Sequence, residues 1–404
     1  MKKIYLGIFV LVILGLVFSQ LPPVKSRLSW RVEVAKTYLR GVINPVGAVP
    51  TAKATNTLIS LSSSTPEATP ALSVTPTIEP TATGTPEPLP AQVSLSVPNY
   101  ELQDMNNCGP ASLTMALRYY GWDGDQFDIS EIIKPIPQDR NVNPEEMVYY
   151  VRNYAGWLRA EYRVNGNLYL LKKLIAAGYP VLIEETFHFD EPYYPNDDLW
   201  AAHYLLLTAY DDKDGAFIGQ DSYQGANQRI PYETLMEDWK PFNRVYMLIY
   251  LPEDEDELAL LLGDDWDEEK NRENARQASQ RATEENPDDA FAWFNLGSNL
   301  LYFEEYAQSA NAYDQARSLG LPQRMMRYQF GAFIASFQDH RTEDLLALTK
   351  YALQRTPNSE EALLWRGWGL YQQGDYEGAI ASWELALKHR PNYFDAEYAL
   401  DFAR

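Results

Sequence analysis

The 404-residue sequence is short of cysteine, histidine and basic residues. It has one cysteine, Cys108, so this residue alone can supply thiol chemistry, and none is available to anchor a lipid near the N-terminus. Its four histidines limit the imidazole bases and metal ligands to a short set. The chain has 34 lysines and arginines and 56 acidic residues, so its net charge is −22. A chain this acidic repels phosphate backbones, so we expect no nucleic-acid partner.

Cys108 stands where a helix is predicted to begin. Asn106 or Asn107 supplies the N-cap, and Pro110 is tolerated in the first turn because its missing N–H would be unpaired there anyway. Apolar residues then recur at helical spacing before Gly121: Leu113, Ala116, Leu117 and Tyr120. The helix dipole favours a first-turn thiolate by about 0.3–1 kcal/mol. Cys108 is therefore a candidate nucleophile, and the alternative is a small buried apolar residue.

A predicted hairpin brings a histidine and an aspartate together. Its two strands are residues 204–210 and 216–220, and the turn between them is residues 211–215. Folding about Lys213 places Asp221 close to Leu205, so the carboxylate lies beside His203 at the start of the first strand. A carboxylate there holds the tautomer and orientation of the ring. With Cys108, these are the residue types of a triad for thiol acyl transfer.

Cys108, His203 and Asp221, in this order along the chain, resemble the C39-like branch of the papain-fold cysteine peptidases. The resemblance covers roughly residues 97 to 251. Gln103 lies five residues before Cys108, the stretch LLKKLIAAGYPVLI predicts a helix, a turn and a strand, and a His-strand-turn-strand-Asp segment follows. The resemblance implies that Cys108 is the nucleophile, His203 its base and Asp221 the orienting group. It also implies that Gln103 and the Cys108 backbone N–H bind the oxyanion. Ser222 stands where many relatives carry proline.

A metal site is the alternative use of His203. The other ligands would be His188 and the acidic residues Asp190, Asp197 and Asp198. Their spacing matches no familiar ligand pattern, and residues 190–198 predict an exposed loop because of their Pro and Asn residues. We therefore expect no metal and no other cofactor.

The N-terminus predicts export. Lys2 and Lys3 precede an apolar run over residues 4–18, and residues 1–25 are predicted to be a signal peptide or an uncleaved signal anchor. No small-residue A-x-A cleavage site follows, which favours an anchor with the lysines inside. The chain beyond residue 25 then faces outside the cytoplasm, anchored to the membrane, or is secreted if the segment is cleaved.

Three stretches of unusual composition divide the rest of the chain. Residues 26–53 are basic with interspersed apolar side chains and predict a juxtamembrane segment on the membrane surface, or a short helix or stalk. Residues 54–95 are rich in Thr, Ser and Pro and predict a disordered linker. Residues 252–270 predict an acidic connector after the 96–251 peptidase domain; Leu258 to Leu262 indicate a packed helix, and calcium binding is the alternative.

The C-terminal part repeats itself. Prolines at 287, 322, 357 and 391 recur at intervals of 35, 35 and 34 residues, and glycines at 297, 331 and 367 follow in matching phase. This period is typical of tetratricopeptide repeats, so residues 271–404 predict an all-α repeat domain. The middle unit, residues 324–357, departs most from the pattern. Repeats of this kind generally offer a concave face to a peptide or protein partner.

The sequence therefore predicts an α+β papain-like cysteine peptidase domain, followed by an all-α tetratricopeptide repeat domain and tethered outside the cytoplasm. Its expected substrate is a peptide or protein, cut at a peptide or amide bond, and its repeats are expected to recruit a protein partner or substrate. A non-catalytic peptide-binding scaffold is the alternative from another class. Hydrolysis of cell-wall peptides, or transfer to an amine, would use the same residues.

Overall fold

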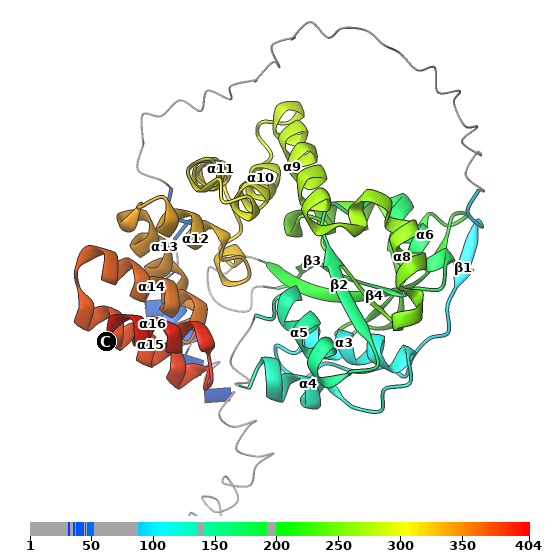
Figure 1. Cartoon of the computed structure of the whole chain (residues 1–404), viewed down its shortest axis with the longest axis horizontal. Coiled ribbons are helices and arrows are strands. Elements are labelled where there is room, and N and C mark those ends of the chain that lie inside the picture. Colours follow the sequence, from blue (N-terminus) through cyan, green and yellow to red (C-terminus); the bar gives the residue numbers. More distant parts are fainter. Residues whose placement is uncertain are drawn as a thin grey trace, which may run out of the picture.

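The structure is a computed structural model, which describes residues 31–32, 35–36, 38–43, 45, 47–51, 88–135, 141–191 and 199–404. The described chain forms a sheet unit followed by an array of helices, which lie side by side (Figure 1). The predicted N-terminal membrane segment, residues 1–25, and most of the predicted linker lie outside the described residues. Within the described ranges, no helix combines the length and apolar character that a membrane span requires.

The sheet unit contains one antiparallel sheet in the order β2-β7-β3-β4-β5-β6, with β1 paired to β4. Its strands are β1 (Gln92–Ser94), β2 (Arg159–Arg163), β3 (Val181–His188), β4 (Trp200–Asp211), β5 (Ala216–Asp221), β6 (Gly225–Pro231) and β7 (Tyr246–Tyr250). The predicted hairpin is confirmed as β4 and β5, and Leu205 lies opposite Asp221 in their register. β4 begins before the predicted strand, so His203 is its fourth residue and not its first.

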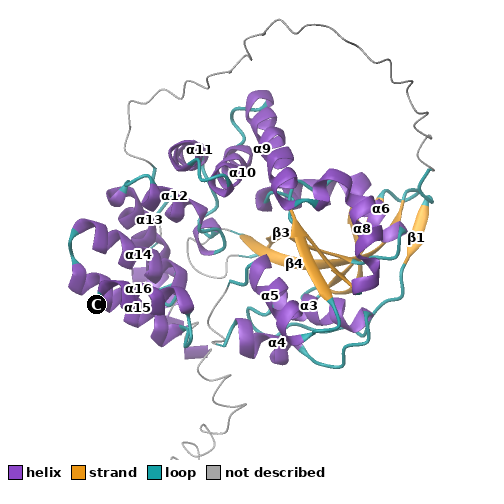
Figure 2. Ribbon diagram, in the orientation of Figure 1, coloured by secondary structure: helices purple, strands orange, loops and turns teal. Residues whose placement is uncertain are grey.

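Helices cover both faces of this sheet (Figure 2). They are α3 (Cys108–Tyr119), α4 (Gln126–Ile133), α5 (Pro144–Tyr154), α6 (Leu168–Ala176), α7 (Tyr232–Trp239) and α8 (Glu255–Leu262), with 3-10 turns η1 (Lys240–Phe242), η2 (Pro252–Asp254) and η3 (Gly263–Trp266). Leu182 and Leu206 pack with α3, α4 and α5, whereas Ile183 and Leu205 face α6 and α8. The central strands are apolar at successive positions because both faces are covered.

Helix α3 is buried on all sides and not only along the predicted apolar stripe. Every residue from Gly109 to Leu117 is buried, because the helix lies between the sheet and the neighbouring helices α4 and α5. The Ser112 hydroxyl donates a hydrogen bond of 3.0 Å to the backbone carbonyl of Tyr204, which satisfies a polar group inside the core. This bond ties the helix that begins at Cys108 to the strand that carries His203.

The second unit is all-helical. Its elements are α9 (Glu268–Glu285), α10 (Ala290–Tyr302), α11 (Tyr306–Leu319), η4 (Met325–Arg327), α12 (Gly331–Gln338), α13 (Thr342–Arg355), α14 (Glu360–Gln373), α15 (Tyr376–His389) and α16 (Phe394–Ala403). Paired helices approach closely at glycine: a Cβ on Gly367 would lie 2.2 Å from Nε1 of Trp383. A side chain at that position would therefore push α14 and α15 apart, which explains the phase of the glycines.

The two units share one hydrophobic core. Trp200 and Phe242 of the sheet unit belong to the same buried cluster as Phe294, Met325 and Phe333 of the helical unit. The Trp200 and Phe242 rings stack with centroids 5.6 Å apart. Burying aromatic side chains of this size contributes several kcal/mol, so the helical unit is a packed part of the fold and not a loosely tethered module.

The polar contacts across this boundary are also specific. Asn243 donates from Nδ2 to Oδ1 of Asn299 at 2.7 Å, between η1 and α10. At the far end of the array, the Arg390 guanidinium lies 2.6 Å from the Glu146 carboxylate of α5. Contacts at both ends therefore fix the orientation of the helical unit on the sheet unit.

One predicted boundary moves, and the predicted connector is folded. β1 lies inside the stretch predicted as linker, so the folded unit begins before residue 96. It forms a strand because Gln92 to Ser94 pair with Asp211 to Ala209 at the end of β4. The acidic stretch 252–270 is largely helical, as Leu258 to Leu262 indicated, because Leu258 and Leu262 pack against the sheet unit while Leu260 faces outward.

Part of the basic segment 26–53 packs on the helical unit. Val49 is buried in the shared core, and the Arg317 guanidinium donates a hydrogen bond of 2.8 Å to the Pro50 carbonyl. The Tyr351 hydroxyl donates to the Gly47 carbonyl at 3.2 Å. Residues 47–51 therefore belong to the folded body.

Candidate active site

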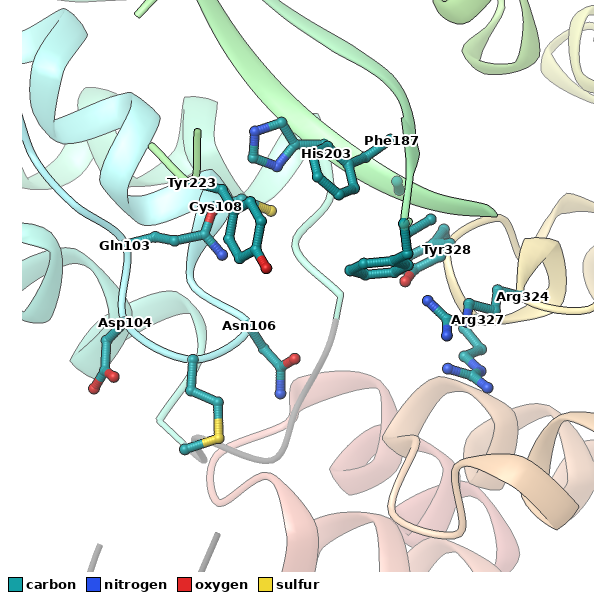
Figure 3. A pocket seen from close by; sticks show the side chains of 14 residues that line it. Gln103, Asp104, Asn106, Cys108, Phe187, His203, Tyr223, Arg324, Arg327 and Tyr328 are labelled. Atoms are coloured by element: carbon teal, nitrogen blue, oxygen red, sulfur yellow. The ribbon is translucent and has the colours of Figure 1, made fainter. Parts of the chain in front are cut away.

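Three of the predicted site residues meet beside β4, and Figure 3 shows two of them, Cys108 and His203. Nε2 of His203 lies 3.0 Å from Oδ1 of Asp221, and both side chains are buried. The Cys108 side chain, at the first position of α3, lines the same pocket as the His203 ring and is close enough to interact with it electrostatically. The hairpin register and the buried helix thus assemble the Cys-His-Asp arrangement that the sequence suggested.

The Asp221 carboxylate is held in place by the turn that follows β5. Its Oδ1 accepts hydrogen bonds from the backbone N–H groups of Tyr223 at 2.7 Å and Gln224 at 2.9 Å. Burial acts to raise the pKa of Asp221, but its bonds to His203 and to these N–H groups outweigh burial and lower it. The carboxylate therefore remains ionised and can orient the His203 ring.

The thiol and the imidazole stabilise each other as an ion pair. Cys108 is partly exposed to a pocket. Desolvation by the surrounding protein acts to raise the pKa of its thiol, but the interaction with His203 and its charge outweighs desolvation and lowers the thiol pKa. Burial lowers the pKa of His203, but its bonds to Asp221 and Cys108 raise it to about 10. Both shifts favour thiolate and imidazolium at neutral pH.

The first prediction concerns this pair. A lowered thiol pKa keeps the thiolate populated as the pH falls, so iodoacetamide is expected to alkylate Cys108 rapidly even at about pH 6. In His203→Ala the hydrogen bond and charge of His203 are lost, while desolvation and the contacts with the Tyr204 and Gly109 backbone remain, so the thiol pKa rises and labelling at about pH 6 should fall by about 100-fold. Mass spectrometry of the intact protein gives the rate without background because Cys108 is the sole cysteine. The same pH profile in both proteins would disprove the pairing.

Gln103, the predicted oxyanion residue, lies next to Cys108 in the pocket (Figure 3). Its backbone N–H donates to the Ser222 carbonyl at 2.8 Å, and its side-chain Oε1 accepts from the Ser222 hydroxyl at 2.9 Å. Because Oε1 is occupied in this way, the amide presents its Nε2 donor to the pocket. The five-residue spacing from Cys108 therefore allows Gln103 to reach the site.

Ser222 was missed as a functional residue. The sequence showed it only as a departure from the proline of many relatives, yet its buried hydroxyl determines which end of the Gln103 amide faces the pocket. A proline at this position has no side-chain donor. The signal was the hydroxyl directly after Asp221, but its partner lies 119 residues away in sequence.

The second prediction tests this contact. Ser222→Ala is expected to lower kcat about 10-fold with little change in KM, because the Gln103 amide loses the bond that orients it. In a Gln103→Ala background the same substitution should have almost no further effect, since there is no amide left to orient. Steady-state kinetics of the two single variants and the double variant measure the coupling. Additive losses would show that Ser222 acts independently of Gln103.

Glu185 is a second residue that the sequence did not single out. It lies directly opposite His203 in the β3–β4 register, and its side chain is buried. Burial raises the pKa of Glu185 to about 8, while the nearby His203 charge acts to lower it. A carboxyl in this environment is mostly protonated at neutral pH, so Asp221 remains the anionic partner of His203.

The histidines do not gather as the alternative metal site required. Nε2 of the largely exposed His188 lies 3.7 Å from Oδ1 of Asp238, whereas His203 faces Asp221. Asp197 and Asp198 lie outside the described residues. Across the ranges that the structure describes, no three His, Cys, Asp or Glu side chains are grouped to hold a metal ion.

The site opens into a pocket of about 350 Å³. Phe187 and Tyr223 form an aromatic wall, with ring centroids 5.2 Å apart, and Cys108 and His203 lie at one end. A partly apolar cleft with a few convergent polar groups is the usual form of a ligand site. The pocket brings together the residue types that acyl transfer uses: a thiol, an imidazole with a carboxylate beside it, and an amide donor.

Residues 94–247 match the model of the Peptidase_C39 like family. This unit is a C39-like peptidase domain. Residues 360–393, which include α14 and α15, match the tetratricopeptide repeat model, so the helical unit is a tetratricopeptide repeat region. A comparison with curated proteins gave no match.

Solved structures similar to each unit were found. A candidate C39-like peptidase from Bacillus anthracis is 17% identical, with 39% of this chain and 96% of that chain covered and a TM-score of 0.31. The peptidase domain of Streptococcus ComA, a bifunctional ABC transporter, is 15% identical, with 39% and 99% covered and a TM-score of 0.30. The tetratricopeptide repeat protein YrrB is 18% identical, with 36% and 73% covered and a TM-score of 0.30.

Proposed function

We propose that this C39-like domain is an active cysteine peptidase that hydrolyses peptide or amide bonds. The observation that carries the proposal is the chain of contacts from Cys108 through His203 to the ionised Asp221, at one end of a pocket that also contains Gln103. A buried cysteine with only a structural role needs neither a raised imidazole pKa nor an orienting carboxylate.

In the proposed reaction, the Cys108 thiolate attacks the substrate carbonyl, whose oxygen gains the negative charge. Nε2 of Gln103 and the Cys108 backbone N–H donate hydrogen bonds to that oxygen. The His203 imidazolium gives its proton to the leaving amine as the C–N bond breaks, which leaves a thioester on Cys108. His203 then removes a proton from water, the hydroxide attacks the thioester, and the acid product and the free thiol are released.

The location is also a proposal, which rests on the sequence of residues 1–25. Two lysines followed by an apolar run favour an anchor with the folded body outside the cytoplasm. In this arrangement the residues between the anchor and residue 47 connect the membrane to the folded body, because residues 47–51 pack on the helical unit and the Thr, Ser and Pro-rich stretch comes after them. We propose that the repeats also bind a protein partner or substrate, as surfaces of this class generally do.

The decisive experiment incubates the full-length chain with a diverse mixture of peptides and identifies the products by mass spectrometry. A peptidase should produce a recurrent cut-site pattern that depends on Cys108. A peptide-binding scaffold should retain peptides through washing and cut none of them. The second result would replace the catalytic proposal by the non-catalytic alternative, because the pocket would then bind without acyl transfer.

A further inference from the structure

A second pocket, of about 330 Å³, lies between the peptidase domain and the repeat region; we call it the interdomain pocket. Its peptidase side includes Glu145 of α5 and Glu184 of β3, and its repeat side includes residues of α10 and of the segment that leads into α12. Tyr328 lines both this pocket and the active-site pocket, where Figure 3 shows it on the side opposite Gln103. The two pockets therefore adjoin each other.

Glu184 places a carboxyl group near the proposed nucleophile. It pairs with Tyr204 in the β3–β4 register, one residue beyond His203 along β4. The Tyr204 ring packs against the first turn of α3, since a Cβ on Gly109 would lie 3.4 Å from its Cδ2 atom. Cys108 precedes Gly109 in that turn. A peptide bound at Cys108 can therefore extend one of its side chains towards Glu184.

Glu184 is buried without a countercharge. It is 3% exposed, and within the described chain no lysine, arginine or histidine forms an ion pair with it. The Tyr204 hydroxyl is a polar neighbour, but it donates its one proton to the Val142 carbonyl at 2.8 Å. Burial, followed by the charges of Cys108 and Glu145, raises the pKa of Glu184 well above its usual range. A cation brought by a ligand would offset these effects, whereas a neutral group would not.

The rest of the lining also suits a cation. Oε1 of Glu145 accepts a hydrogen bond of 2.7 Å from the Tyr162 hydroxyl, and a carboxylate has room for further donors. Tyr328 and Phe330 add aromatic rings, whose faces attract ammonium and guanidinium groups. Arg272 also lines the pocket, but its guanidinium lies 5.6 Å from the centre of the Tyr162 ring. Among the residues that the structure describes, it forms no ion pair with either carboxylate.

A lysine or arginine side chain supplies what this pocket lacks. Its aliphatic stem can pack on the apolar lining, which includes Leu301 and Ile334, while its head brings a positive charge to Glu184. The net charge of −22 on the whole chain also favours the approach of a cationic peptide. A free N-terminal amine carries the same charge but lacks the stem.

We infer that the interdomain pocket is a substrate subsite for a basic side chain, with Glu184 and Glu145 as its acidic groups, so that peptides with a lysine or arginine near the cleaved bond are preferred. The inference rests on the proposed peptidase function, whose substrate class it specifies. The repeat region then completes the substrate site, in addition to any partner that it binds elsewhere.

The test measures binding separately from cleavage. Octapeptides of alanine, glycine and leucine, acetylated and amidated at their ends, carry Lys, Arg, Gln or Glu at one scanned position and are titrated calorimetrically into full-length Cys108→Ala. We expect the best Lys or Arg peptide to bind about 10-fold more tightly than its Gln counterpart, and the Glu peptide to bind most weakly. The Gln peptide with a free N-terminus distinguishes a side-chain cation from a terminal amine.

Charge variants then assign the effect to the pocket. Glu184→Gln in the Cys108→Ala background removes the charge with little change of shape, so the preference should fall towards one while the Gln peptide keeps its affinity. Glu145→Gln should lower the preference in part. Glu377→Gln is the matched control, because Glu377 is exposed in the first turn of α15 and lies outside both pockets. Circular dichroism melting of each variant checks folding.

The outcomes separate this inference from the proposed function. Equal binding of Lys, Arg and Gln peptides, no binding of any peptide, tight binding conferred by the free N-terminus alone, or a preference that persists in both glutamate variants would overturn the subsite. A preference for basic peptides in Cys108→Ala without any cleavage by the unsubstituted chain would support the subsite and reject the peptidase. Cleavage that ignores peptide charge would support the peptidase and reject the subsite.

Discussion

Replacing Cys108 or His203 by alanine is expected to lower peptide cleavage by about 10⁴-fold or more. In the proposed reaction, Cys108 supplies the attacking sulfur, and His203 both favours its thiolate form and carries the proton to the leaving amine. Because nucleophile and base act in one step, the double variant should be little slower than either single variant. The measurement is kcat/KM on a peptide identified by the mass-spectrometric assay.

His188→Ala is the matched control for the histidine. His188 is largely exposed at the end of β3 and does not line the pocket, so its removal should leave turnover unchanged. If His203→Ala retains a tenth or more of the activity, the proton must move through another group. Cleavage by Cys108→Ala at the rate of the unsubstituted protein would refute the thioester route.

Gln103→Ala should lower kcat by about 10²–10³-fold, which is the usual cost of losing one preorganised oxyanion donor. The donor acts on charge that develops in the transition state, so KM should change little. Alkylation of Cys108 should keep its rate and pH profile, because Gln103 is not among the groups that shift the thiol pKa. These two readouts distinguish loss of the donor from a general disturbance of the site.

The control for this substitution is Gln228→Ala, on β6 and outside the residues that line the pocket. It should not change kcat. Gln103→Glu is more informative still, since a carboxylate facing the oxyanion would repel it and should reduce kcat at least as far as alanine does. Unchanged turnover in Gln103→Ala would show that the side chain does not reach the reacting carbonyl.

Local sequence signals predicted much of the site because each acts over a short stretch. Asn107 stands at the N-cap of α3 and Pro110 in its first turn, as predicted, although the Asn107 side chain makes no capping hydrogen bond. The turn cluster pairs Asp211 with Ala216, and a register shift between Leu207 and Ala209 then places Asp221 opposite Leu205. That register, in turn, brings the carboxylate to within 3.0 Å of His203. The helical region was predicted in the same way, from the spacing of its repeated prolines and glycines alone.

The apolar stripe of α3 and the start of β4 were predicted less well. The stripe was too narrow because Ser112, a polar residue, is buried against Tyr204. β4 starts earlier because Trp200 packs on Phe242 and on the helical unit. The sequence of the strand alone does not indicate these contacts. In both cases tertiary packing overrode the local pattern.

The sequence by itself determined the repeat architecture, which periodicity encodes. It also predicted Cys108, His203 and Asp221 as the residues of the proposed triad, from helix and turn signals. Only the tertiary structure decided that Ser222 orients Gln103, that Glu185 lies beside His203, and that Arg324 and Arg327 line the pocket. Ser222 and Gln103 are 119 residues apart, and the arginines come from a different folded unit. Such contacts depend on how whole elements pack around a shared core, which no local spacing specifies.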